Sequence, residues 1–402
     1  MPNYLHPGVY VEEVDSGVHP IQAVGTSTAA IVGQAPLATA LVNTPTRVDN
    51  WSQFLNLFVG RDNKGNFNAS TDLSNAAYGF FVNGGTTLYV TNVGKSNPIK
   101  PGLDALAAID EVAIVAAPGY TDGVSYDALL SHCELLKDRV AILDCPVDAT
   151  VEAMKDVPNM LRKRIVRLLP AAATNGHAAT HPRISPGGYG AVYFPWIRAA
   201  DPLDPQQNVV PMAPSGHMAG IYARTDATRG VHKAPANEPV RSAVGVTNPI
   251  LDADQDALNP LGVNCIRFFS SKGVIAWGAR TLADPASDWR YVNVRRLFNM
   301  IEESIQDGTS WVVFEPNDSV LWKSIRRDVG DFMTRMWRDG ALVGASPEEA
   351  FFVKCDAETN PSDVVNAGSV VTLIGAAPVR PAEFVVFRIS QSAEAFAAVE
   401  GA

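Results

Sequence analysis

An alternation of apolar and polar residues opens the chain and has no partner nearby in the sequence. It lies at residues 7–14 (PGVYVEEV), where Val9 and Val11 alternate with polar or aromatic neighbours before Val14. This period of two is typical of a β-strand. Because no second strand-like run follows closely, we expect residues 1–24 to form an extended N-terminal arm.

From about residue 25, short apolar runs alternate with helical patterns. Five runs bounded by Gly or Pro predict buried strands, at residues 28–35, 86–93, 111–118, 139–146 and 191–197. Helix-like patterns lie between or after them, at residues 73–82, 102–109, 125–137, 151–169 and 219–230. Such strands pair in parallel, because a parallel connection must be long enough to hold a helix. The pattern therefore predicts one doubly wound α/β domain over residues 25–264.

The last third of the chain has a different pattern. A hairpin and two amphipathic helices are expected first, at residues 265–282, 291–307 and 318–338. Strand-like runs follow, at residues 350–356, 369–379 and 383–390. We therefore predict an α+β C-terminal domain over residues 265–381 and a C-terminal arm over residues 382–402.

Composition and charge narrow the class of protein. The 402 residues are 47% hydrophobic and 18% charged, which is typical of a folded chain of two or three domains. The formal net charge of -10 argues against general binding to nucleic acid or to an anionic membrane, since both need an excess of Lys and Arg. No apolar run reaches the length of about 18 residues that a membrane span needs. The N-terminus also lacks the basic start and apolar run of a secretory signal, so we expect the protein to stay in the cytoplasm where it is made.

One motif suggests a protease. The sequence around Ser27 (GTSTA, residues 25–29) is similar to the serine motif of subtilisin-like enzymes. In those enzymes the serine follows the aspartate and the histidine along the chain. Only His6 and His19 precede Ser27, and both belong to the predicted arm. The residue order therefore predicts no protease activity.

Other candidate sites fail on spacing. His177 and His181 are four residues apart, but the glutamate that a zinc protease needs at position 178 is absent. The Gly-Lys-Ser sequence at residues 94–96 lacks the earlier glycine of a phosphate-binding loop. The alternating aspartates at 252–256 lack the later glycine and glutamate of a calcium loop. We expect no metal, no cofactor and no catalytic residues.

Several longer blocks resemble those of phage tail sheath proteins. In the first two thirds of the chain these are PGVYVEEV (7–14), TSTAAIVGQAPLA (26–38), LSNAAYGFFVNGGTTLYVTNV (73–93) and GHMAGIYARTDATRGVHKAPANEP (216–239). In the last third they are NPLGVNCIRFFSSKGVIAWGARTLA (259–283), RYVNVRRLFNMIEESI (290–305), ASPEEAFFVKCDAETNP (345–361) and APVRPAEFVVFRISQ (377–391). The resemblance covers nearly the whole chain in the same order.

The resemblance implies a structural protein and not an enzyme. In this family a subtilisin-like middle domain without protease activity, here 25–264, precedes an inner C-terminal domain completed by strands exchanged between subunits. Family members polymerise as stacked hexameric rings around a tail tube. They contract to drive the tube through the host cell envelope for genome ejection.

The resemblance also implies partners and a location. The expected partners are other copies of the chain, the tail tube protein, and the baseplate and tail terminator proteins, with no nucleic acid and no direct membrane insertion. The expected location is the virion tail, after assembly in the host bacterial cytoplasm. The sheath of a tailocin or another phage-derived contractile injection particle is the alternative, and a subtilisin-like hydrolase is a distant one.

The same resemblance moves the expected working residues to the two arms. Both arms would add strands to a sheet of another subunit, through Val9, Tyr10, Val11, Val14, Phe384, Val385, Val386 and Phe387. The folded domains would then move as rigid bodies on contraction, with the arm linkers at residues 15–24 and 376–382 bending as hinges.

A basic stripe on the helix predicted at residues 318–338 is the candidate surface for the tube. Lys323, Arg326 and Arg327 lie on its polar side at helical spacing. In an acidic protein such a stripe fits an acidic tube surface, and an ordinary solvated helix face is the alternative.

Overall fold

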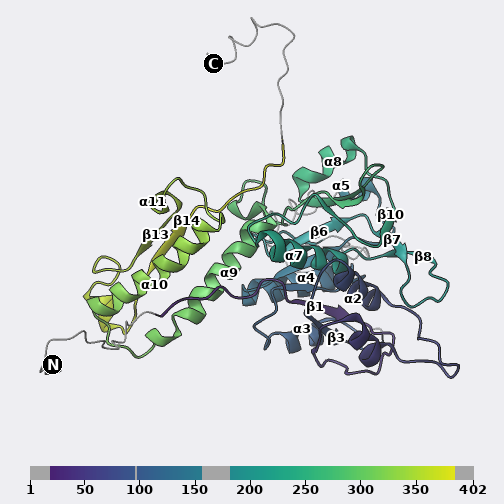
Figure 1. Cartoon of the computed structure of the whole chain (residues 1–402), viewed down its shortest axis with the longest axis horizontal. Helices are drawn as coiled ribbons and strands as arrows, with labels where there is room; N and C mark the ends of the chain where they lie inside the picture. Colours follow the sequence, from purple (N-terminus) through teal and green to yellow (C-terminus); the bar gives the residue numbers. More distant parts are fainter. Residues whose placement is uncertain (1–18, 96, 156–181, 385–402) are drawn as a thin grey trace, which may run out of the picture.

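A nine-stranded sheet forms the centre of the larger of two units and contains all five strands predicted from the apolar runs (Figure 1). The computed structural model describes residues 19–95, 97–155 and 182–384. The strands lie side by side in the order β2 (Thr46–Val48), β3 (Leu88–Asn92), β1 (Ala29–Gly33), β4 (Ile114–Ala116), β5 (Val140–Asp144), β6 (Gly190–Phe194), β11 (Val263–Phe269), β12 (Gly273–Ala276) and β9 (Glu238–Pro239).

The predicted parallel pairing is confirmed in the middle of this sheet. Strand β1 pairs in parallel with β3 on one side and with β4 on the other, so that Ile31 lies opposite Val90 and Ala116. The parallel ladder continues through β4–β5, β5–β6 and β6–β11. Pairing is antiparallel toward the two ends of the sheet, where β2 pairs with β3 and β12 pairs with both β11 and β9.

Helices cover both faces of the sheet, as the doubly wound prediction requires. Along β1, Ala29 and Ile31 face a cluster that includes α2 (Asp72–Val82) and α7 (Ser215–Arg229). Their neighbours Ala30 and Val32 face the opposite cluster, which includes α3 (Lys100–Leu106) and α4 (Gly123–Leu136). A strand with apolar residues on both faces is typical of a sheet buried between two helical layers.

The hairpin predicted at residues 265–282 is present, but it belongs to the large sheet. Strands β11 and β12 form it, and they also pair with β6 and β9. The sheet therefore extends past the predicted division at residue 264 as far as Ala276. The apolar run identified the hairpin, but its partners lie far away in sequence and no local pattern could name them.

The smaller unit is built on two long helices, as predicted. They are α9 (Val292–Gly308), which lies between the two units in Figure 1, and α10 (Ser319–Arg338). Asp318 caps α10 by accepting hydrogen bonds from the backbone N–H groups of Val320 and Leu321, at 2.8 and 3.0 Å. Buried residues of both helices share one apolar cluster, with α11 (Pro347–Ala350), β13 (Phe351–Lys354), α12 (Ser362–Asn366) and β14 (Leu373–Ala376) completing the unit.

The remaining elements are short. A second sheet of three strands lies beside the large one and has the order β10 (Ala243–Val246), β7 (Ile197–Ala200) and β8 (Val209–Met212). The short helices are α1 (Trp51–Phe54), η1 (Leu55–Val59), α5 (Val151–Lys155), α8 (Asp252–Leu258), η2 (Asn259–Leu261), η3 (Asp288–Arg290) and η4 (Ser310–Val312). The helix predicted at residues 151–169 is seen as α5, and its remainder lies outside the described residues, as do His177 and His181. Among the helices of the described part, none is both long and apolar enough to cross a bilayer.

Candidate intersubunit surfaces

The hairpin of β13 and β14 is a sheet of only two strands. Its strands pair antiparallel, with Phe352 opposite Gly375 and Val353 opposite Ile374. Phe351 and Val353 pack against the apolar cluster of the smaller unit, whereas Phe352 is 58% exposed. Within the described ranges, no third strand pairs with either edge. An isolated two-stranded hairpin is marginally stable, and its free edges are sites where another strand can add.

The chain enters the described fold on the smaller unit. The side chain of Ile21 is buried in the cluster beneath α9 and α10. Arg335 donates a hydrogen bond to the backbone oxygen of Ile21, and the N–H of Val24 donates to Ser304 Oγ at 3.0 Å. Close packing against Ile21 requires glycine at position 308, because a Cβ there would lie 2.7 Å from the Ile21 side chain. The described part of the predicted hinge 15–24 is therefore fixed to the two helices.

The chain leaves the described fold along a second fixed segment. Backbone hydrogen bonds join Val379 to Ala341 at 3.1 Å and Ala377 to Ala350 at 2.9 Å. Beyond them, Arg280 donates to both carboxylate oxygens of Glu383, at 3.0 and 2.5 Å. The predicted hinge 376–382 is thus held to the smaller unit, and Glu383 just after it is held by Arg280, which does not fit a freely bending linker.

Most of the predicted arm residues lie outside the described ranges. These are Val9, Tyr10, Val11, Val14, Val385, Val386 and Phe387. Phe384, the last described residue, is 76% exposed and belongs to no strand. Most of this side chain is uncovered by the described part of the chain, so it is available to a neighbour.

The structure brings the three candidate tube-facing cations together on the exposed side of α10. Lys323, Arg326 and Arg327 are all exposed, and the opposite side of the helix is buried. Arg327 Nε donates to Oδ1 of the buried Asp328 at 2.9 Å, so this cation is partly held by an ion pair. The helical spacing predicted this stripe correctly, and its partner stays a prediction.

A buried ion pair joins the two units and was not predicted. Arg296 on α9 donates to both carboxylate oxygens of Asp226 on α7, at 2.9 and 2.5 Å. The Arg296 side chain is 2% exposed and that of Asp226 is 5% exposed. Thr26 completes the site: its backbone oxygen accepts from Arg296 at 2.8 Å, and its hydroxyl donates to Asp226 at 2.6 Å. The geometry ties α7, α9 and the segment before β1 into one body.

A small pocket beside this ion pair holds a carboxyl group with a raised pKa. It is lined by residues of α9, of the segment before β1 and of the loop before β5. Glu303 of α9 is half-buried, and burial, followed by repulsion from Asp138, Asp307 and Asp110, raises its pKa to about 7.

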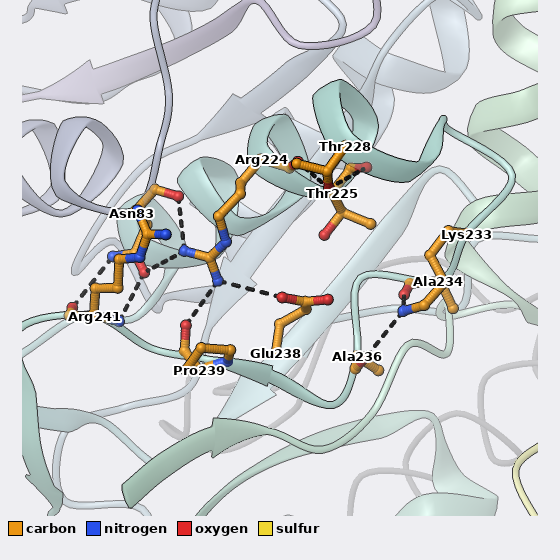
Figure 2. Close-up of polar contacts among 10 residues, drawn as sticks. All are labelled: Asn83, Arg224, Thr225, Thr228, Lys233, Ala234, Ala236, Glu238, Pro239 and Arg241. Atoms are coloured by element: carbon orange, nitrogen blue, oxygen red, sulfur yellow. Dashed lines mark hydrogen bonds and ion pairs between the residues drawn. The ribbon is translucent and has the colours of Figure 1, made fainter. Parts of the chain in front are cut away.

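Two cations hold the loop between α7 and β9 and the short strand that follows it (Figure 2). Arg224 of α7 donates to the backbone oxygens of Asn83 and Pro239, at 2.9 and 2.8 Å, and lies 3.6 Å from Glu238. The ammonium group of Lys233 donates to two carbonyl oxygens of its own loop, and burial lowers its pKa. Figure 2 shows Arg224 directed toward the strand end and Lys233 turned back into the loop.

The same loop reaches the smaller unit. Val231 is buried in the apolar cluster of that unit. The backbone oxygen of His232 accepts a hydrogen bond from Asn293 of α9 at 2.8 Å. This loop falls within the GHMAGIYARTDATRGVHKAPANEP block, so part of that block serves the junction between the units. The resemblance could have indicated that this block is important, but no residue spacing within the block predicts its contact with the smaller unit.

A buried serine–carboxylate contact lies at the end of the large sheet, and no histidine among the described residues joins it. Asp144, the last residue of β5, accepts hydrogen bonds from the Ser215 N–H and hydroxyl groups at 2.8 and 2.7 Å. Burial raises the pKa of Asp144 to about 7. His217 instead contacts Ser242 at 3.3 Å, and burial lowers its pKa to about 4. Among described residues no histidine ring bonds to Ser215, and no three His, Cys, Asp or Glu side chains there form a metal site.

Two adjoining family descriptions match the chain. The phage tail sheath protein central domain matches residues 103–282, and the phage tail sheath C-terminal domain matches residues 284–392. The tail sheath protein of Vibrio phage KVP40 is 28% identical over 215 residues, which is 53% of this chain. The chain spans about a third of that relative's length, since the match covers 31% of it.

Solved structures match over the full length. The sheath of an extracellular contractile injection system, PVC, in its contracted state is 28% identical, with a TM-score of 0.74. That match covers 98% of this chain and 100% of the PVC chain. A chain in the baseplate of the anti-feeding prophage is 29% identical, with a TM-score of 0.71 over 97% of this chain. With both sheath domains matched in order and the same fold along the whole sequence, the chain belongs to the phage tail sheath protein family.

Proposed function

We propose that this chain is the sheath subunit of a contractile tail. It polymerises as stacked hexameric rings around a tail tube and contracts to drive the tube through a host cell envelope, for genome ejection in the case of a phage. The observation that carries the proposal is the likeness to the contracted PVC sheath over 98% of this chain. The location that follows is a virion tail, assembled in the bacterial cytoplasm.

A phage-derived injection particle is the second candidate, and one observation favours it. The match to the PVC sheath covers all of that chain, whereas the match to the KVP40 sheath protein covers 31% of the phage protein. The likeness to sheath chains of contractile injection particles over nearly all of this chain thus supports this candidate. Capsid genes next to the sheath gene would indicate a phage, and their absence would indicate a particle.

We further propose that the larger unit is a subtilisin-like domain that serves as a scaffold without protease activity. The doubly wound sheet supports the fold, and the Ser215–Asp144 contact without a histidine supports the absence of catalysis. The division between the two units then lies near residue 283, after the last strand of the large sheet and between the two family matches.

The two-stranded hairpin supports strand exchange between subunits. Its free edges and exposed Phe352 are suited to strands from the arms of neighbouring copies, residues 8–14 from one and 383–390 from another. The docked segments before β1 and after β14 present these arms from a fixed base. We propose that the bending points on contraction lie outside the docked parts of both linkers.

The expected result for the purified full chain is self-assembly into hollow, striated tubes. Such tubes follow from a rigid subunit that carries both strand-donating arms and a strand-accepting hairpin. Negative-stain electron microscopy at increasing protein concentration checks this outcome. Uniform single particles at all concentrations, with or without a tube as template, would contradict the proposed function.

We propose that the basic stripe of α10 faces the tail tube. Its positive charge would complement an acidic tube surface. Reversing charge at two positions, with Arg326→Glu and Arg327→Glu together, should leave template-free tubes intact and reduce loading onto purified tail tubes by at least about tenfold at low salt. Co-sedimentation of sheath with tubes measures the loading. Lys64→Glu, at an exposed lysine in the loop before α2 of the larger unit, provides the control. Equal loading of all three proteins would show that the stripe is an ordinary solvated face.

A further inference from the structure

The turn between α9 and α10 carries a strained, fully exposed aromatic residue. Phe314 has a φ of 72°, in the left-handed region that residues with a Cβ rarely adopt. Its side chain has no cover from the described parts of the chain, and Val313 beside it is 64% exposed. A bulky apolar side chain held in an unfavourable backbone conformation toward solvent suggests a contact made with another molecule.

Hydrogen bonds fasten the turn on the C-terminal side of Phe314 and across it. Asn317 donates to the backbone oxygen of Ser369 at 2.9 Å, and the indole N–H of Trp322 donates to Asn317 Oδ1 at 2.8 Å. Within the turn, the N–H of Glu315 donates to the oxygen of Val312 at 3.1 Å. An exposed aromatic on a preorganised base loses little conformational freedom on binding and is typical of an interface anchor.

The N-terminal arm departs from the same place. His19, the first described residue, stacks on Trp311 with ring centroids 4.3 Å apart, and Trp311 is three residues from Phe314. The strand-like arm ends at Val14, and five Cα steps join Val14 to His19. Five steps of extended chain span at most about 18 Å. A copy that receives residues 8–14 as a strand therefore comes within about 18 Å of His19, which stacks on Trp311 at the base of the Phe314 turn.

From this placement we infer that Phe314 is a second contact between copies, which docks on the hairpin of the copy that receives the arm. The receiving surface has matching chemistry, since Phe352 and Leu373 are 58% and 50% exposed on β13 and β14. A patch that fits a different patch on an identical chain makes a head-to-tail contact, which propagates into a helical polymer. The inference rests on the proposed function, because it takes the arm as the strand donor.

The test is the polymerisation of the full chain with Phe314→Asn. Asparagine tolerates the left-handed region, so the folded subunit should keep its thermal stability or gain some. Loss of the aromatic contact should raise the critical concentration for tubes at least about tenfold, measured by sedimentation. Leu135→Asn is the matched control, because Leu135 is 80% exposed on α4 of the other unit, and it should leave the critical concentration unchanged.

A crosslinking measurement distinguishes a direct contact of Phe314 with another copy from an effect of the substitution on the fold of the subunit. With the photoreactive benzoylphenylalanine in place of Phe314, assembled particles should give sheath–sheath products joined to peptides of residues 351–376. Products with the tube protein, or a critical concentration equal to that of the unaltered chain, would overturn this inference alone. Failure of the unaltered chain to form tubes would overturn the proposed function, and this inference with it.

Discussion

Replacing Arg296 by alanine should lower the free energy of unfolding by about 3–5 kcal/mol, the largest effect on stability expected for one side chain of this protein. The change leaves the buried carboxylate of Asp226 without its cation, and the backbone oxygen of Thr26 loses a donor. An unpaired buried charge costs more than the ion pair itself contributes, because desolvation is no longer offset. Urea denaturation of the monomer, followed by circular dichroism, measures the effect.

Two further variants test the cause. Lys100→Ala removes an exposed ion pair with Asp104 and should change the stability by no more than about 0.5 kcal/mol. Arg296→Met combined with Asp226→Leu removes both charges and should recover much of the loss, because no unpaired charge then remains. A loss below about 1 kcal/mol for Arg296→Ala, or no recovery in the double variant, would show that the ion pair does not hold the units together.

The order of strands and helices in the larger unit could be predicted because each element carries its own period. The runs around Ile31 and Val90 are short, β-branched and bounded by breakers, and the helices between them require parallel pairing. The pairing of the β11–β12 hairpin with β6 could not be predicted from local periodicity. Its pairing with β6 joins residues some seventy positions apart, and pairing over such a distance leaves no local pattern.

The candidate surfaces also differ in whether a local sequence pattern could predict them. The basic stripe at Lys323, Arg326 and Arg327 follows from helical spacing alone, since α10 begins and ends almost where predicted. The ion pair of Arg296 with Asp226 joins two helices with no shared motif, and the sequence gives no sign of it. The left-handed backbone of Phe314 is equally hidden, because the residue type argues against that conformation.

The contacts between the larger and the smaller unit bear on how this subunit can move. Thr26, Arg296 and Asp226 join the two units through buried polar contacts, and Glu383 is held by Arg280 from the other side. A junction of this kind favours motion of the whole subunit as one body over motion between the units. Under the proposed strand exchange, rearrangement between copies would then be carried by the arms.

Deleting residues 1–15 should abolish sheath tubes while leaving the monomer folded, the largest effect on assembly that we expect. The described part of the fold starts at His19, so the deletion removes no residue of the three apolar clusters. Six ladder hydrogen bonds contribute about 3–9 kcal/mol, whereas ordering six backbone residues costs about 6–12 kcal/mol. Backbone pairing therefore falls short by about 3 kcal/mol, which burial of two or three valines at about 1.5–3 kcal/mol each can offset.

This balance predicts which change within the arm matters. Val9→Ser combined with Val11→Ser keeps every backbone hydrogen bond but should prevent tubes almost as completely as the deletion, because pairing without apolar burial is unfavourable. Glu12→Gln combined with Glu13→Gln alters the same strand without removing apolar surface, and tubes should form normally. Electron microscopy of the three proteins beside the unaltered chain gives the answer. Long tubes from the chain without residues 1–15 would show that the arm is dispensable, and normal tubes from the valine variant would show that backbone pairing suffices.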